Sequence, residues 1–320
     1  MSDPTANRHA QPLRGDVILV AYNPTAGKGD RQAKIDALVQ QLRGASFTVE
    51  LCSEPQRLQE LATTLFAKGS LRGVIAAGGD GTVAMAVNAL PHDIPLALFP
   101  LGTENLLARY VGHTCNSEFM ATLFREGRSV ALDAASANGR IFCLMAGCGF
   151  DAEVVRLTHA VRSSGFTRWS YLKPILMAIR AYSRAEMLVT VEHNGRSESL
   201  ACRWAFISNI PRYAAGLRFN PQANAQDGLL DVCLFQHCTV LAGLRYFAGV
   251  WLGWHARWSD VTLRQATAIR IESSATLPYQ LDGDPGGELP LEIRCLPERL
   301  NLIVMPAWAQ KHGFLGRDSS

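Results

Sequence analysis

A glycine-rich turn at Gly78–Thr82, with the sequence Gly-Gly-Asp-Gly-Thr, is the sharpest chemical signal in the chain. Its two leading glycines let the backbone approach a phosphate closely, and the carboxylate of Asp80 can meet a metal-bound nucleotide. Thr82 can cap a following helix. On turn chemistry alone, the alternative is a plain Asp-Gly turn with a capping threonine. The pattern predicts phosphate handling.

A second candidate phosphate loop covers residues 23–29, Asn-Pro-Thr-Ala-Gly-Lys-Gly, between an expected strand and an expected helix. Glycines and small residues there would let backbone N–H groups close on an anion at the helix N-terminus. The Walker spacing is absent, because Tyr22 occupies the first glycine position and Gly29 the hydroxyl position. An ordinary strand-to-helix turn stays open as the other interpretation.

The first third of the chain alternates apolar runs with segments of helical periodicity, which must position these loops. Strands are expected at 16–22, 47–52, 73–77 and 96–99, and helices at 30–43, 56–67 and 82–90. This alternation predicts a parallel sheet covered on both faces. Ligands of such sheets bind beyond the carboxyl ends of the strands, where the loops 23–29, 78–82 and 101–105 all follow.

The pattern changes to β-strands with turn signals from about residue 129. Asn138-Gly139 and Asn194-Gly195 predict two tight hairpins, 197–207 reads as one strand, and 239–254 as a helical insertion. The second half is therefore expected to be mostly antiparallel. The predicted limits are a disordered lead-in at 1–14, an α/β domain at 15–132, a β domain at 133–304, and a C-terminus at about 305–320 that packs back on the first domain.

Composition excludes several classes of protein. Hydrophobic residues make up 48% and charged residues 18% of the 320-residue chain, which is far from the profile of disordered proteins. A net charge of +3 is too small to indicate nucleic acid. No clean apolar run reaches the roughly 20 residues needed to cross a bilayer, and no secretory signal is seen. Scattered cysteines favour reduced thiols and a cytoplasmic protein.

Five motifs in order resemble the bacterial diacylglycerol-kinase-like and sphingosine-kinase-like lipid kinases, over residues 17–305. They are Asn23-Pro24-x-x-Gly27, Gly78–Thr82, Pro100-Leu-Gly-Thr-x-Asn105, Asp227-Gly-Leu-Leu-Asp231 and Leu281-Asp-Gly-Asp284. The resemblance implies an NAD-kinase/phosphofructokinase-like parallel α/β domain, an antiparallel β-sandwich domain that binds lipid, and an active site in the cleft between them. NAD kinases share the second motif, but their third motif differs.

The resemblance also implies Mg-ATP as cosubstrate and assigns roles to individual residues. The nucleotide site would be lined by Asn23, Pro24, Thr25, Ala26, Gly27, Ser53, Gly78, Gly79, Asp80, Gly81, Thr82, Val83, Ala84 and Thr103. Asp80, Asp282 and Asp284 would be the catalytic carboxylates, and either of the last two could take the proton of the acceptor hydroxyl. Either could instead be a turn residue at Gly283. The family ends this turn in Glu, and Asp284 is shorter.

A structural magnesium is implied at Asn224, Asp227 and the Leu229 carbonyl, since oxygen ligands suit a hard cation. Asp133 matches an acidic family position in a polar network that reaches this metal. A β-turn around Asp227 and a satisfied buried carboxylate at Asp133 are the alternatives. Many family members continue the third motif as Asn-Asp, whereas this chain has Leu106 there. Sphingosine- and ceramide-directed relatives also carry an apolar residue at that position.

A lipid kinase must also reach its substrate at a membrane surface. Segment 165–184, with the residues just before it, combines basic and aromatic side chains as interfacial helices do: Arg162, Phe166, Arg168, Trp169, Tyr171 and Lys173. A core-packed helix is the alternative.

The expected partners are a lipid substrate and a membrane surface that the protein contacts peripherally, and no nucleic acid is expected. A homodimer is left open. The residues are compatible with three functions: lipid kinase, NAD kinase, and a nucleotide-binding regulator that has lost catalysis.

Overall fold

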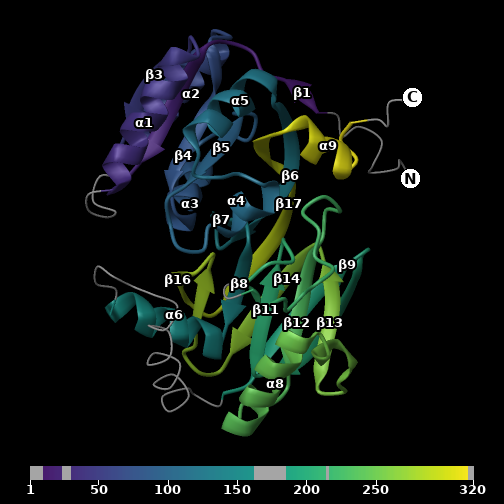
Figure 1. Cartoon of the computed structure of the whole chain (residues 1–320). Helices are drawn as coiled ribbons and strands as arrows, with labels where there is room; N and C mark the ends of the chain where they lie inside the picture. Colours follow the sequence, from purple (N-terminus) through teal and green to yellow (C-terminus); the bar gives the residue numbers. More distant parts are fainter. Residues whose placement is uncertain (1–9, 24–29, 162–184, 214–215, 316–320) are drawn as a thin grey trace. The chain divides into compact units, whose positions relative to one another are not determined.

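The computed structural model describes residues 10–23, 30–161, 185–213 and 216–315 (Figure 1). Two compact units divide this part of the chain. The first comprises the described residues of Met1–Leu132 and Glu298–Ser320, and the second is Asp133–Pro297. Strands β6 (Arg128–Ala137) and β17 (Leu291–Val304) each cross a unit boundary.

The first unit contains a parallel sheet with the strand order β5-β4-β2-β3, joined at β5 by the end of β17. The strands of the parallel sheet are β2 (Val17–Tyr22), β3 (Thr48–Cys52), β4 (Leu71–Gly78) and β5 (Leu96–Pro100), and the unit also contains β1 (Gln11–Pro12), which pairs antiparallel with β6. Its helices are α1 (Asp30–Gly44), α2 (Pro55–Ala67), α3 (Asp80–Ala89), α4 (Leu106–Val111), α5 (Ser117–Glu126) and α9 (Pro306–Lys311). The predicted alternation of strand and helix is confirmed.

Helices cover both faces of this sheet, which explains its continuous apolar strands. Ile18 and Val20 of β2 pack in one core cluster with Leu38 of α1 and Phe124 of α5. Successive strand residues point to opposite faces. The intervening Leu19 is also fully buried, on the face where α2 and α3 contact β2 and β4.

Two expectations for the first unit are wrong. Helix α3 begins at Asp80 with Gly79 as its N-cap, so Thr82 lies within the first helical turn and does not cap the helix. The tight strand-to-helix connection leaves no residue between the glycines and the helix. The expected disordered lead-in contains β1, whose Gln11 pairs with Ser129 of β6. Residues 1–9 lie outside the described residues.

The second unit consists of two antiparallel sheets. One has the order β10-β9-β14-β17, and the other β13-β12-β11-β8-β15-β16. The strands not yet bounded are β7 (Arg140–Phe142), β8 (Met145–Cys148), β9 (Met187–His193), β10 (Arg196–Cys202), β11 (Trp204–Ser208), β12 (Leu230–Phe235), β13 (Val261–Ala266), β14 (Ala268–Ser273), β15 (Pro278–Leu281) and β16 (Asp284–Glu288). The helices are α6 (Phe150–Val161), α8 (Val240–Leu252) and the 3-10 turn η3 (His255–Arg257).

Residues from both sheets share one core, which makes the unit a β-sandwich. Val189 and Ile271 of the first sheet lie in the same buried cluster as Ile207 and Val232 of the second. Both predicted hairpins are present. Asn138 (φ 46°) and Asn194 (φ 51°) each precede a glycine with positive φ, as type I′ turns require.

One predicted strand, 197–207, is two strands in different sheets. β10 pairs with β9, whereas β11 pairs with β8 and β12, and the chain crosses between the sheets at Arg203. The residues of β10 are mostly exposed, whereas all five residues of β11 are buried, and this contrast accompanies the change of sheet. The predicted membrane-docking segment 165–184, with Arg162, lies outside the described residues.

Candidate active site

The loops predicted to handle phosphate follow neighbouring strands at one edge of the parallel sheet. Ala21 of β2 pairs with Cys52 of β3, and Gly78 of β4 pairs with Pro100 of β5. Parallel strands end at the same edge of a sheet, so the residues that follow these paired positions gather along that edge. They are Asn23, Ser53, Gly78–Thr82 and Leu101–Asn105. The sheet therefore gathers the loops that sequence spacing had only put in order.

The two glycine loops lie in direct backbone contact. The Leu101 N–H donates to the Gly78 carbonyl at 2.9 Å. A methyl group placed on Gly102 would lie 2.6 Å from the Gly79 Cα, which is closer than real side chains approach a backbone atom. Only glycine fits at residue 102, while a methyl group on Gly79 would lie 3.3 Å from the Gly102 Cα, so the crossing favours glycine in both loops.

Asp80 links the loop Gly78–Thr82 to the loop Leu101–Asn105. Its Oδ1 accepts a hydrogen bond from the Leu106 N–H at 2.9 Å, at the start of α4. The preceding Asn105 (φ 47°) closes its loop on Gly102 by accepting from that N–H at 3.0 Å and donating to that carbonyl at 2.8 Å. The Leu106 side chain is buried. The Asp80 side chain therefore ties the loop Gly78–Thr82 to the start of α4.

The other predicted nucleotide residues fall into three groups. Asn23, Ser53 and Thr103 are exposed after their strands, where a ligand could reach them. The side chains of Val83 and Ala84 are buried in α3, so only their main chain is left for a nucleotide. Pro24, Thr25, Ala26 and Gly27 lie outside the described residues.

The Asp282 carboxylate, in the second unit, accepts hydrogen bonds from main-chain N–H groups. Asp282 forms a two-residue hairpin turn with Gly283 (φ 52° and 85°) between β15 and β16. Its two carboxylate oxygens accept from the N–H groups of Cys143, Leu144 and Met145 at 2.8–3.0 Å. Burial raises the pKa of Asp282 to about 6, and these three donors oppose that rise. The side chain positions the turn.

Asp284, at the start of β16, is the more accessible acid of the pair. Its side chain is 29% exposed, and one oxygen lies 4.0 Å from the Arg140 guanidinium, which is too long for a strong ion pair. The turn built by Asp282 therefore sets the direction in which Asp284 projects. The two acids therefore differ in their hydrogen bonding and in their exposure.

A buried network behind this turn was missed at the sequence level. Asp151 of α6 accepts hydrogen bonds from the Tyr213 hydroxyl and, at 2.8 Å, from the Gln280 amide. The Gln280 amide oxygen accepts in turn from the Gly283 N–H at 2.8 Å. Asp151 thus supports the turn through Gln280. The only sequence signal for it was an acid two residues after Gly149, inside a glycine-rich stretch.

The stability of the protein should depend on the ionisation of Asp151. Burial raises the pKa of Asp151 from 3.8 to about 6. The folded chain binds this proton more tightly than the unfolded chain, so the stabilisation is complete below pH 3.8 and lost as the pH rises through 6. Between pH 4 and 7 the wild type should lose roughly 2 kcal/mol of unfolding free energy relative to Asp151→Asn. Urea titrations of both proteins measure this, and parallel pH profiles would contradict it.

The predicted metal residues share one turn of the second unit. The carboxylate of Asp133, a fully buried side chain, accepts from the Gly228 N–H at 2.8 Å, and Asp227 accepts from the Leu229 N–H at 3.0 Å. Asn224 is exposed in the same turn. Asp133 therefore holds the backbone of this turn in place.

The residues of this turn fit a hard cation. One carboxylate oxygen of Asp231 is buried without a hydrogen-bond partner, and burial followed by the charge of Asp227 raises the pKa of Asp231 to about 6. Two acids and nearby carbonyls are oxygen donors of the kind magnesium takes. Across the described residues, no group of three or more His, Cys, Asp or Glu forms a ligand set. A metal here would need amide or carbonyl oxygens as well.

Two family models together match most of the chain. The diacylglycerol kinase catalytic domain model matches residues 17–137, and the YegS C-terminal NAD kinase beta sandwich-like domain matches residues 145–304. The chain belongs to the diacylglycerol kinase catalytic-domain family.

Named relatives cover nearly the whole chain. A diacylglycerol kinase of Mycobacterium tuberculosis is 28% identical over 89% of this chain and 94% of its own length. A diacylglycerol kinase of Bacillus subtilis is 26% identical over 90% and 95%. A solved structure of a diacylglycerol kinase from Bacillus anthracis aligns with a TM-score of 0.66 at 24% identity, over 91% of this chain and 98% of that one, which shows the shared fold.

Proposed function

We propose that this protein is an ATP-dependent lipid kinase that transfers the γ-phosphoryl group to a lipid hydroxyl. The observation that carries the proposal is the backbone crossing of Gly79 and Gly102 at the carboxyl ends of parallel strands, tied together by Asp80. Such loops expose main-chain N–H groups to phosphate at a helix N-terminus. Phosphoryl transfer needs mainly this kind of positioning and charge stabilisation.

Asp284 is proposed to accept the proton of the attacking hydroxyl. Its side chain is 29% exposed, whereas both oxygens of Asp282 accept hydrogen bonds from main-chain N–H groups. A general base must reach the acceptor hydroxyl within hydrogen-bond distance. Asp282 is proposed as a positioning residue that holds the turn.

The acceptor is proposed to be a lipid hydroxyl of either the diacylglycerol or the sphingoid and ceramide type. Leu106 offers only its N–H to the site, and that N–H is bonded to Asp80. The buried leucine side chain cannot accept a hydrogen bond or touch a metal. This departure from the Asn-Asp motif of many relatives supports a broader acceptor class than diacylglycerol alone.

We propose that magnesium binds to Asp227, Asn224 and the Leu229 carbonyl. The cation would neutralise the neighbouring carboxylates of Asp227 and Asp231 and order the turn that Asp133 supports.

Millimolar magnesium should raise the melting temperature of the wild type by a few degrees, because a ligand that binds only the folded state stabilises it. Asp227→Asn should lose most of this shift. Thermal denaturation with and without magnesium measures it, with Glu292→Gln on the exposed face of β17 as the control. Equal shifts in all three proteins would contradict the site.

An NAD kinase and a regulator without catalysis are the competing functions. ATP consumption should be measured with diacylglycerol, sphingosine, ceramide and NAD in parallel, for the wild type and Asp80→Ala. The proposal expects lipid-dependent ADP release by the wild type, loss of it in the variant, and none with NAD. Turnover with NAD alone would favour the NAD kinase. Nucleotide binding without turnover on any acceptor would favour the regulator.

A further inference from the structure

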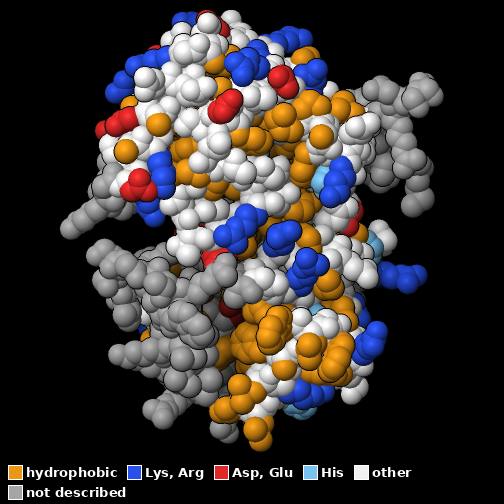
Figure 2. All heavy atoms as spheres, viewed as in Figure 1, with side chains coloured by type: hydrophobic (Ala, Val, Ile, Leu, Met, Phe, Trp, Pro, Cys, Tyr) orange, Lys and Arg blue, Asp and Glu red, His pale blue; other side chains and the backbone are white. Residues whose placement is uncertain are grey.

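Helix α8 carries an apolar stripe on its outward face. Val240, Leu241, Leu244, Trp251 and Leu252 are all exposed, with Leu241 at 80% and Trp251 at 79%. At 3.6 residues per turn, these positions and Ala248 span an arc of roughly 120°. Figure 2 shows hydrophobic side chains gathered over α8. A surface helix normally shows polar residues on this face.

The opposite face of α8 is already packed, so the stripe cannot turn inward. Gly243 and Gly249 bring the helix close to indole rings, since a methyl group on Gly243 would lie 2.9 Å from Trp204 and one on Gly249 would collide with Trp258. Tyr246, on the same side, is fully buried. Both faces of the helix are therefore apolar, and only one of them is covered by the fold.

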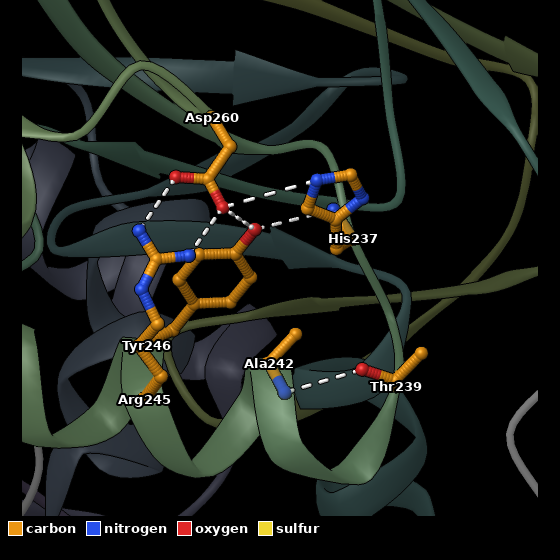
Figure 3. A network of polar contacts seen from close by, with 6 residues as sticks. All are labelled: His237, Thr239, Ala242, Arg245, Tyr246 and Asp260. Carbon is orange, nitrogen blue, oxygen red and sulfur yellow. Dashed lines mark hydrogen bonds and ion pairs between the residues drawn. The ribbon is translucent and has the colours of Figure 1, made fainter.

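A polar network fixes the helix to the sheet behind it (Figure 3). Asp260 accepts from the Arg245 guanidinium at 2.7 and 3.0 Å and from the Tyr246 hydroxyl at 2.7 Å. Arg245 holds the pKa of Asp260 below its usual value. The Arg245 guanidinium also lies 4.1 Å from the centre of the Trp258 ring. The exposed stripe is thus presented by a rigid support.

The charge around the stripe suits an anionic surface. Between Asp231 and Asp260 the sequence has no acidic residue, and the Asp260 carboxylate forms an ion pair with Arg245. Arg257 is exposed beyond the end of the helix, and the exposed His237, before its start, has its Nε2 4.0 Å from Asp260. Trp254, which is 55% exposed, follows the helix end. Apolar residues, interfacial tryptophans and basic flanks are the combination found in helices that lie in the plane of a membrane.

We propose that the apolar stripe of α8 docks the protein on an anionic phospholipid bilayer, with the helix lying in the interface. α8 has 13 residues, and no helix in the described part of the chain is long and apolar enough to cross a membrane. A second copy of the chain is the competing occupant. The bilayer is favoured because the exposed indoles and the exposed guanidinium of Arg257 match anionic lipid headgroups, whereas a self-associating copy would bring two such guanidinium groups together.

The test uses vesicle flotation with equimolar phosphatidylglycerol and phosphatidylcholine. The triple variant Leu241→Gln, Leu244→Gln, Trp251→Gln should partition roughly 100-fold more weakly than the wild type, because three exposed apolar side chains no longer enter the interface. Leu188→Gln is the matched control, since Leu188 is 47% exposed on β9 of the same unit. It should bind as the wild type does. Equal melting temperatures would show that every variant is folded.

Two outcomes would overturn the proposal: unchanged flotation of the triple variant, or a wild-type dimer in light scattering that only the triple variant loses. The proposal deepens the proposed lipid kinase function, so turnover is measured in parallel on detergent-dispersed and on vesicle-borne lipid. The triple variant should lose turnover on vesicles and keep it in detergent. If no lipid supports turnover while flotation still depends on the stripe, the proposed function fails and the docking surface stands.

Discussion

Replacing Asp284 with Asn is expected to lower kcat for lipid phosphorylation by roughly 10²- to 10⁴-fold, the range for loss of a general base. The partly exposed side chain contributes little to the fold, so the free energy of unfolding should change by less than about 0.5 kcal/mol. KM for ATP should also stay near the wild-type value, because Asp284 does not belong to the phosphate loops. Steady-state kinetics with saturating lipid in detergent micelles measure all three quantities.

Two comparison variants make this expectation specific. Glu288→Gln changes an exposed acid on the same strand and should leave kcat unchanged. Asp282→Asn replaces one accepting oxygen by an N–H donor opposite main-chain N–H groups, so it should cost about 1–3 kcal/mol of stability. A wild-type kcat in Asp284→Asn, with loss of activity but not of stability in Asp282→Asn, would exchange the roles of the two acids.

Gly102→Ala should weaken nucleotide binding strongly, because its methyl group would meet the Gly79 Cα at 2.6 Å. Neither backbone can move away cheaply, since Leu101 is bonded to Gly78 and Asn105 closes the second loop on residue 102. Overpacking of this kind costs about 1–3 kcal/mol. If the cost falls on the loop arrangement, the Kd for ATP rises by roughly 10- to 100-fold.

The matched control is Gly44→Ala at the end of α1, where an added methyl group meets nothing within 4 Å. Its ATP affinity and melting temperature should equal those of the wild type. Isothermal titration with a non-hydrolysable ATP analogue measures the affinity of each variant. Wild-type affinity in Gly102→Ala would show that the crossing of the two loops does not form the nucleotide site.

The fold was predictable where the information is local. Strand and helix periodicities placed the parallel unit, and Asn138 and Asn194 before glycine marked two hairpins by backbone chemistry alone. The break at Arg203 was not predictable, because it depends on which partner strands lie on either side. The apolar residues of α8 were taken as an ordinary helical insertion, since sequence periodicity does not reveal which face the fold leaves uncovered.

In the candidate site, too, local features were predictable and contacts between distant segments were not. The motif residues Gly78–Thr82 and Asp284 could be found from turn chemistry and the family resemblance. Contacts between distant segments could not: Asp80 bonds the Leu106 N–H, and Asp282 bonds the main chain after Phe142. Asp151 was missed because a buried acid in a helix carries no signal until its partners are known. Long-range hydrogen bonds separate the acids that position from the acid proposed to react.

The fate of the γ-phosphate tests most directly whether the protein phosphorylates a lipid. The purified protein is incubated with magnesium, a total lipid extract and ATP labelled in the γ-phosphate, and the organic phase is resolved into lipid classes. Label is expected in a phosphorylated lipid with the wild type and with Glu288→Gln, and it should be absent with Asp284→Asn. Label that stays entirely in the aqueous phase, as inorganic phosphate or as phosphorylated NAD when NAD is added, would contradict this expectation.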